Sequence, residues 1–131
     1  MIGFINGCFD VLHIGHIEMF KECKKMVDVL VVAIDSDSRI KNNKGAKRPY
    51  NSMEDRKNML MNLKTIDVVF SFDSDEELTN LIKCLNPNIM MVGEEYKNKT
   101  VIGSQYAKQL KFFRRLDGYS TTKILQNSLS R

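Results

Sequence analysis

Short apolar runs, most of them rich in β-branched residues, alternate along this chain with segments that carry helix signals. Together with the segment at residues 111–114, these runs predict strands over residues 2–5, 29–34, 65–72, 89–92 and 111–114. Helical spacing and N-cap patterns predict helices over residues 16–26, 52–63, 74–85 and 104–110, and a last helix capped by Ser120. Strands that alternate with helices favour an α/β domain with a mostly parallel five-stranded sheet and helices on both faces.

The loops of such a sheet have a predictable place. In a parallel sheet the connections that leave the carboxyl ends of the strands share one edge. The polar stretch over residues 35–50 is predicted to be such a loop. The turn at Gly7, the loops at Asp35 and Gly93 and the segment at Arg115 should therefore converge on one pocket.

The length of 131 residues suits one compact domain over residues 1–131 with a single apolar core. No apolar stretch approaches the roughly 18 to 20 uncharged residues of a membrane span, and the start lacks a basic segment followed by an apolar secretion signal. Cys8, Cys23 and Cys84 are widely spaced, which fits a reducing compartment and neither a disulfide framework nor a paired zinc motif. We expect a cytoplasmic protein without a membrane partner.

The formal charge of +4 is mild, and basic residues alternate with acidic ones except over residues 41–48 and 114–115. Few aromatic residues lie among the basic ones, whereas proteins that bind single-stranded nucleic acid stack bases on aromatic side chains. We therefore expect no nucleic-acid partner.

The most informative motif, NGCFDVLHIGH over residues 6–16, follows the first predicted strand. A strand that runs into a small-residue turn and a helix start can place a phosphate on backbone N–H groups and on the positive end of the helix dipole. His13 and His16 can point at the same phosphate and stabilise the charge that builds on it. Gly7 and Gly15 let the main chain approach the ligand closely. A structural pair and a zinc pair are the alternatives, but no further Cys or His lies at zinc-ligand spacing.

The segment GCFDVLHIGH resembles the GxFDxxHxGH motif of the cytidylyltransferase-like nucleotidyltransferases, and RLDGYSTT at residues 115–122 resembles their second motif, RTxGxSTT. The resemblance covers nearly the whole chain and implies a Rossmann-like domain. It also implies that an oxygen of a phosphorylated small molecule attacks the α-phosphate of a nucleoside triphosphate and expels pyrophosphate. A phosphate oxygen is already ionised at neutral pH, so no general base is needed, and the chain has neither a GxSxG nor a GxxxxGK[ST] motif.

The resemblance also implies the site residues. We predict that the catalytic groups are His13, His16, Lys44 and Arg115. The predicted nucleotide-binding residues are Gly7, Cys8, Phe9, Asp10, Gly15, Arg48, Arg56, Gly93, Glu94, Tyr96, Ser120, Thr121 and Thr122. Mg²⁺ is the expected cofactor, held mainly by the triphosphate, and no protein metal ligand is predicted.

Several of these residues have a plainer alternative. Cys8 can be a small apolar filler of the turn, and Ser120 can simply cap a helix. Asp10 can orient a histidine or the metal shell, or act only as a turn residue. A lysine such as Lys44 in a loop is usually solvated, but Lys44-Gly45-x-x-Arg48-Pro49 followed by Arg56 resembles the KGxxRP...R stretch of heptose 1-phosphate adenylyltransferases.

The resemblance leaves two substrate pairs open. Arg115, the STT run at residues 120–122 and the Glu94-Glu95 pair resemble glycerol-3-phosphate cytidylyltransferases and favour CTP as donor with glycerol 3-phosphate as acceptor. The turn at residues 7–10 and the KGxxRP stretch favour the alternative, ATP-dependent heptose 1-phosphate adenylyltransferase. An inactive nucleotide-binding module is the alternative of another class. Members of the family are often homodimers, and we expect a homodimer here.

Overall fold

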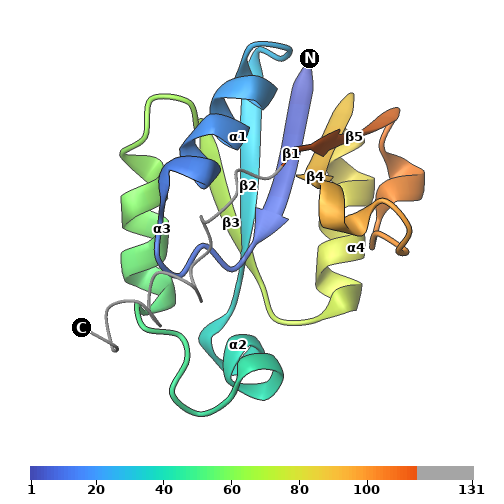
Figure 1. Ribbon diagram of the computed structural model, residues 1–131. Helices are drawn as coiled ribbons and strands as arrows, with labels where there is room; N and C mark the ends of the chain where they lie inside the picture. Colours follow the sequence, from blue (N-terminus) through green and yellow to red (C-terminus); the bar gives the residue numbers. More distant parts are fainter. Residues whose placement is uncertain (115–131) are drawn as a thin grey trace.

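The computed structural model describes residues 1–114, which form one five-stranded sheet with helices on both faces (Figure 1). The strands are β1 (Ile2–Gly7), β2 (Val29–Asp35), β3 (Val68–Phe72), β4 (Ile89–Gly93) and β5 (Gln109–Phe113). The helices are α1 (Ile14–Lys24), α2 (Asp37–Lys44), α3 (Met53–Met61) and α4 (Asp75–Leu85), with 3-10 turns η1 (Glu94–Tyr96) and η2 (Ser104–Tyr106). No helix within residues 1–114 is long and apolar enough to cross a bilayer.

All pairs of neighbouring strands in this sheet are parallel, and the strand order is β3-β2-β1-β4-β5. The chain moves outward from β1 to β3, then crosses back through α4 to place β4 on the other side of β1. The order therefore reverses between β1 and β4. In open α/β sheets, ligands bind in the crevice that such a reversal leaves beyond the carboxyl ends of the strands.

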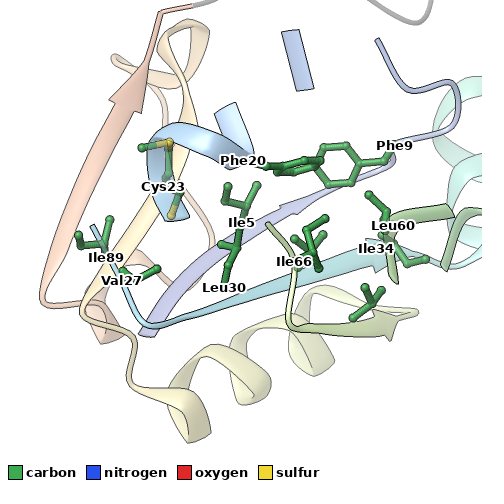
Figure 2. Packing of buried hydrophobic residues seen from close by; sticks show 13 residues of the cluster. Ile5, Phe9, Phe20, Cys23, Val27, Leu30, Ile34, Leu60, Ile66 and Ile89 are labelled. Carbon is green, nitrogen blue, oxygen red and sulfur yellow. The ribbon is translucent and has the colours of Figure 1, made fainter. Parts of the chain in front are cut away.

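The two faces of the sheet carry separate halves of the core. Helices α1 and α3 cover one face (Figure 1), where Phe20 and Leu60 pack with Ile5 (Figure 2). Helix α4 covers the other face and buries Ile82 against a cluster that includes Phe4. The neighbours Phe4 and Ile5 point to opposite faces because side chains alternate along a strand. Both faces are covered, which is why β2 and β4 have nearly continuous apolar sequences.

The predicted mostly parallel sheet with helices on both faces is confirmed, but the prediction of a loop over residues 35–50 is wrong where α2 forms. This helix contains only one apolar residue, Ile40, which is buried. Its N-cap is Ser36, whose hydroxyl accepts a hydrogen bond from the Arg39 N–H. A single apolar residue gives no periodic signal, so the helix was not expected from the sequence.

The predicted helix over residues 104–110 is also wrong. Only the turn η2 forms there, and β5 begins at Gln109, paired with Ile89 of β4. Gly103 stands before the turn with a φ of 80°, and Ile82 of α4 lies against it so closely that a Cβ would collide. This left-handed residue and the pairing with β4 override the helical preference of the segment. The predicted last helix, after Ser120, lies outside the described residues.

Candidate active site

A cavity of about 330 Å³ lies where the strand order reverses. The ends of three strands reach it through Gly7 of β1, Asp35 of β2 and Gly93 of β4. The predicted convergence of these three segments is thus confirmed. Arg115, the fourth segment of that prediction, lies outside the described residues, as do Ser120, Thr121 and Thr122.

The cavity wall has a polar and an apolar part. The polar part includes Asn6, Asp35, Arg39, Lys44 and Thr100. The apolar part includes Phe72, Leu78, Met91, Val92, Val101 and Ile102. Convergent polar groups over an apolar wall are typical of small-molecule sites, and the volume lies near the lower end of their range of about 300–1,000 Å³.

Five of the predicted site residues line this cavity, namely Gly7, Cys8, Lys44, Gly93 and Tyr96. Lys44 is exposed at the last residue of α2. Glu94 stands next to Gly93 at the start of η1. The Glu95 carboxylate folds back over Gly93, so that a side chain at Gly93 would displace it. Lys44 and Gly93 thus line one cavity, although 49 positions separate them in the sequence.

His13 and His16 lie side by side at the start of α1. Their rings are stacked, with centroids 3.7 Å apart and planes 23° apart. His13 is the N-cap, and its Nδ1 accepts a hydrogen bond from the Gly15 N–H over 3.1 Å. Nδ1 of His16 accepts from the His13 N–H over 3.3 Å. An Nδ1 that accepts carries no proton, so in the neutral form each ring has its N–H at Nε2.

This geometry gives the turn two parallel imidazoles whose Nε2–H groups are donors, next to the N-terminus of a helix. Gly15 uses its N–H to bind His13, so it takes part in the orientation of that ring. Phosphate oxygens bind well at helix N-termini, and imidazole N–H groups add directed donors. The pair is thus suited to stabilise negative charge on a phosphoryl group.

Phe9 supports this pair from within the core. Its ring is 6% exposed and meets the rings of His16 and Phe20 edge to face, at centroid distances of 5.1 and 5.2 Å. A Cβ on Gly7 would lie 3.0 Å from the Phe9 ring. Phe9 itself has a φ of 48°, a left-handed conformation that is unfavourable for a bulky residue and concentrates at functional sites. Gly7 therefore makes room for Phe9.

Asp10 connects this turn to the segment between α2 and α3. Its buried carboxylate accepts 2.8 Å hydrogen bonds from the Arg48 Nε and from the N–H groups of Tyr50 and Asn51. Burial alone would raise the pKa of Asp10, but these donors outweigh it and lower the pKa below its usual value. Asp10 is therefore an ionised anchor for the loop.

Arg48 lies at one edge of this network. Its Nε binds Asp10, and its side chain is 15% exposed. Its Nη2 is buried without a hydrogen-bond partner. A buried donor of this kind is costly unless it finds an acceptor, which fits a residue that completes its bonding when an anionic ligand arrives.

Arg56, on α3, is completely buried. Its Nη1 donates 2.9 Å hydrogen bonds to the carbonyls of Cys8 and Asp35, and its Nε donates to the Asn51 carbonyl over 3.0 Å. Its Nη2 pairs with the Asp37 carboxylate over 2.8 Å. One guanidinium thus ties the ends of β1 and β2 to the start of α3. The structure supports a positioning role for Arg56 beneath the site.

Cys8 contributes a thiol to the cavity wall. Partial burial raises the pKa of Cys8, and the nearby charges of Lys44 and Arg56 oppose that rise without cancelling it. The thiol is therefore mostly protonated at neutral pH, which fits a small wall residue better than a nucleophile.

Arg39 lines the cavity but was not among the predicted site residues. It lies on α2, the helix that was predicted to be a loop, and its Nε binds the Asp35 carboxylate over 2.8 Å. An arginine four residues after an aspartate is a common helix-surface pair, so the motif alone does not mark it. Its place on the cavity depends on the tertiary structure.

Residues 1–114 contain no group of three or more His, Cys, Asp or Glu side chains that could hold a metal ion. Both oxygens of the Asp10 carboxylate already accept hydrogen bonds from the protein. Binding of magnesium mainly through the triphosphate stays a prediction.

Comparisons with known proteins identify the family of this chain. The family described as cytidylyltransferase-like matches residues 4–127. The bifunctional protein HldE of Campylobacter fetus is 46% identical over 93% of this chain and 26% of its own length. HldE of Helicobacter hepaticus is 40% identical over 96% of this chain and 26% of its own length. The chain thus spans about a quarter of the length of the curated relatives it matches.

Solved structures share the fold. The lipopolysaccharide core biosynthesis protein from Thermoplasma volcanium has a TM-score of 0.71 and 27% identity over 89% of this chain and 98% of its own. A pantothenate synthetase from Thermus thermophilus has a TM-score of 0.62 over 94% of this chain and 60% of its own, with 12% identity, and so is similar in fold alone.

Proposed function

The chain belongs to the cytidylyltransferase-like family and is a nucleotidyltransferase, and we infer that it transfers AMP from ATP to a sugar 1-phosphate and releases pyrophosphate. The observation that carries this inference is the cavity at the reversal of strand order, with Lys44 on its wall. His13 and His16 are not among the residues that line this cavity, but Phe9, whose ring packs edge to face on His16, directly follows the lining residue Cys8 in the sequence.

The relatives support the choice of substrates. HldE proteins are similar over nearly the whole chain, and a solved relative is described as a lipopolysaccharide core biosynthesis protein, which points to a sugar acceptor. The KGxxRP stretch at residues 44–49, which resembles heptose 1-phosphate adenylyltransferases, points the same way. Together they favour the ATP alternative over transfer of CMP from CTP to glycerol 3-phosphate.

CTP remains the second candidate because of Arg115 and Glu94. Arg115 lies outside the described residues, and Glu94 stands at the start of η1 next to the cavity. A carboxylate there can accept a hydrogen bond from the amino group of cytosine. The assay described below separates the two nucleotides.

The two substrates would occupy different parts of the site. A cavity of about 330 Å³ suits a small acceptor, while the triphosphate lies along the turn at the start of α1. The acceptor phosphate oxygen attacks the α-phosphorus, the bond to the β-phosphate oxygen breaks, and pyrophosphate leaves. Nε2–H of His13 and of His16 would donate to the phosphoryl oxygens as charge builds in the transition state. Lys44 would supply positive charge nearby.

Magnesium, when bound with the triphosphate, neutralises phosphate charge. The protein's own part is to hold the donors in place, with Asp10 fixing the loop that carries Arg48 and with Arg56 fixing the strand ends. The homodimeric state and the cytoplasmic location stay predictions.

A matrix of four nucleoside triphosphates against glycerol 3-phosphate and a panel of sugar 1-phosphates, read out as released pyrophosphate, tests this function. We expect the largest release with ATP and a sugar 1-phosphate. If pyrophosphate is released with CTP and glycerol 3-phosphate instead, the chain is a cytidylyltransferase. Tight nucleotide binding without release from any pair would favour the inactive module and contradict the proposal.

A further inference from the structure

The polar end of the cavity is built around Arg39, whose guanidinium is held on three sides. Its Nε binds Asp35 at the end of β2, and its Nη2 binds Asp75 at the start of α4. Its central carbon lies 5.3 Å from the centroid of the Phe72 ring, at the end of β3. The Arg39 side chain is 20% exposed. A guanidinium fixed in this way loses little conformational entropy when it binds a ligand.

The charges around Arg39 decide which ligand group suits it. Asp35 and Asp75 together outweigh its single positive charge, so the cluster is a poor site for an anion. Lys44 lies on the cavity wall without such an acidic partner among the described ion pairs. An acceptor phosphate should therefore lie toward Lys44, and a neutral part of the acceptor toward Arg39.

Neutral hydroxyl groups match the remaining chemistry. A carboxylate accepts from O–H groups, and a guanidinium donates to hydroxyl oxygens, so an Asp–Arg pair can bind neighbouring hydroxyls in both directions. Phe72 and Leu78, which also line the cavity, provide an apolar surface for the C–H face of a ring.

We propose that Asp35 and Arg39 are specificity-determining residues that bind the hydroxyl groups of the acceptor and select polyhydroxylated acceptors over short ones. The proposal rests on the proposed function, since it places the acceptor in this cavity. An alternative role for Arg39 is purely structural, as a tie between α2 and α4 through Asp75.

The test compares Arg39→Gln, Arg39→Lys and Asp35→Asn with the control Asp75→Asn. Asn at position 75 removes the carboxylate that pairs with Arg39 and so weakens the tie to α4, and Asp75 does not line the cavity. For the Arg39 and Asp35 variants we expect the KM for a sugar 1-phosphate to rise at least tenfold, because each variant loses a hydrogen bond between a charged side chain and an acceptor hydroxyl. The KM for ATP should stay within twofold, and Asp75→Asn should change either KM less than threefold. Arg39→Lys keeps the charge but loses the two-pronged donor, so it should behave like Arg39→Gln.

An unchanged acceptor KM in Arg39→Gln and Asp35→Asn, or an equal rise in the KM for ATP, would overturn the proposal. Equal effects of Asp75→Asn would assign Arg39 to the structural tie and overturn it as well. Thermal unfolding of each variant shows whether it is folded.

Calorimetry separates this proposal from the proposed function. Sugar 1-phosphates and glycerol 3-phosphate are titrated into the wild type and Arg39→Gln, with and without a non-hydrolysable ATP analogue. If no pair of substrates reacts but the wild type binds a sugar 1-phosphate at least tenfold more tightly than Arg39→Gln does, the proposed function fails and the hydroxyl-binding pair stands. If the wild type binds no sugar phosphate, the pair is refuted too.

Discussion

Arg56 offers the sharpest test of how the site is held together. Its guanidinium donates to the carbonyls of Cys8, Asp35 and Asn51 and pairs with Asp37, and its side chain is completely buried. The perturbation is Arg56→Met, which keeps a long apolar stem and removes every donor. Arg56→Lys is the companion variant, since it keeps the charge but cannot reach all of these acceptors.

The contacts of Arg56 set the expected loss in the free energy of unfolding. Hydrogen bonds to charged groups contribute about 1.5–3 kcal/mol each, but the four here share one group and do not add. Asp37 is 42% exposed and can be solvated once Arg56 is lost, whereas the part-buried carbonyls of Cys8 and Asp35 lose their donor. We expect Arg56→Met to lower the free energy of unfolding by about 3–5 kcal/mol, because three carbonyls lose their donor at about 1–3 kcal/mol each and these losses are not fully additive. Against a total stability of about 5–15 kcal/mol, this is a large fraction.

Urea unfolding monitored by circular dichroism measures the change. The matched control is Lys57→Met, an exposed neighbour on the same helix, which should change the free energy of unfolding by less than about 0.5 kcal/mol. Arg56→Lys should lose most of what Arg56→Met loses. If the free energy of unfolding of both variants lies within about 1 kcal/mol of that of the wild type, the three carbonyls do not depend on Arg56. Its positioning role is then wrong.

Three further predictions concern single groups. His13→Asn keeps an acceptor that can cap α1 but loses the Nε2–H donor, so turnover should fall about 10²-fold with little change in stability, and near-normal turnover would exclude His13 from the reaction. The lowered pKa of Asp10 means that its contribution to stability is complete above the ordinary carboxyl pKa of about 4 and is lost as the pH falls through the lower folded value. The difference in urea midpoint between wild type and Asp10→Asn should therefore shrink in acid, and a difference independent of pH would contradict this assignment. Burial raises the pKa of Cys23 to about 11, so iodoacetamide followed by mass spectrometry should modify exposed Cys84 first and Cys23 only after unfolding, while early labelling of Cys23 would contradict its burial.

The sequence predicted the sheet well because its strands are buried on both faces. Residues 29–34 form a continuous apolar run, and the structure has β2 there, paired with β1 from Ile2 to Gly7. Helix α2 was missed because its stability comes from a Ser36 cap and one buried side chain, Ile40, rather than from an apolar stripe. The segment before β5 was misassigned because pairing with β4 decided its conformation.

The same limit applies to the site. The convergence of Gly7, Asp35 and Gly93 follows from parallel topology, so it could be predicted before any contact was known. The burial of Arg56 could not, because a helix segment rich in charged residues looks like a solvated face. The place of Arg39 on the cavity depends on contacts with Phe72 and Asp75, which come from distant elements.

The proposed reaction transfers AMP, with the α-phosphorus of ATP, to a sugar 1-phosphate. The most direct test follows radioactive phosphorus from ATP labelled at the α position or at the γ position, with magnesium and the sugar 1-phosphate, and separates the products by chromatography. We expect label from the α position to appear in a nucleotide sugar, label from the γ position to appear only in pyrophosphate, and His16→Ala to slow both. Transfer of the γ label to the sugar, or no transfer of the α label to any acceptor, would contradict it.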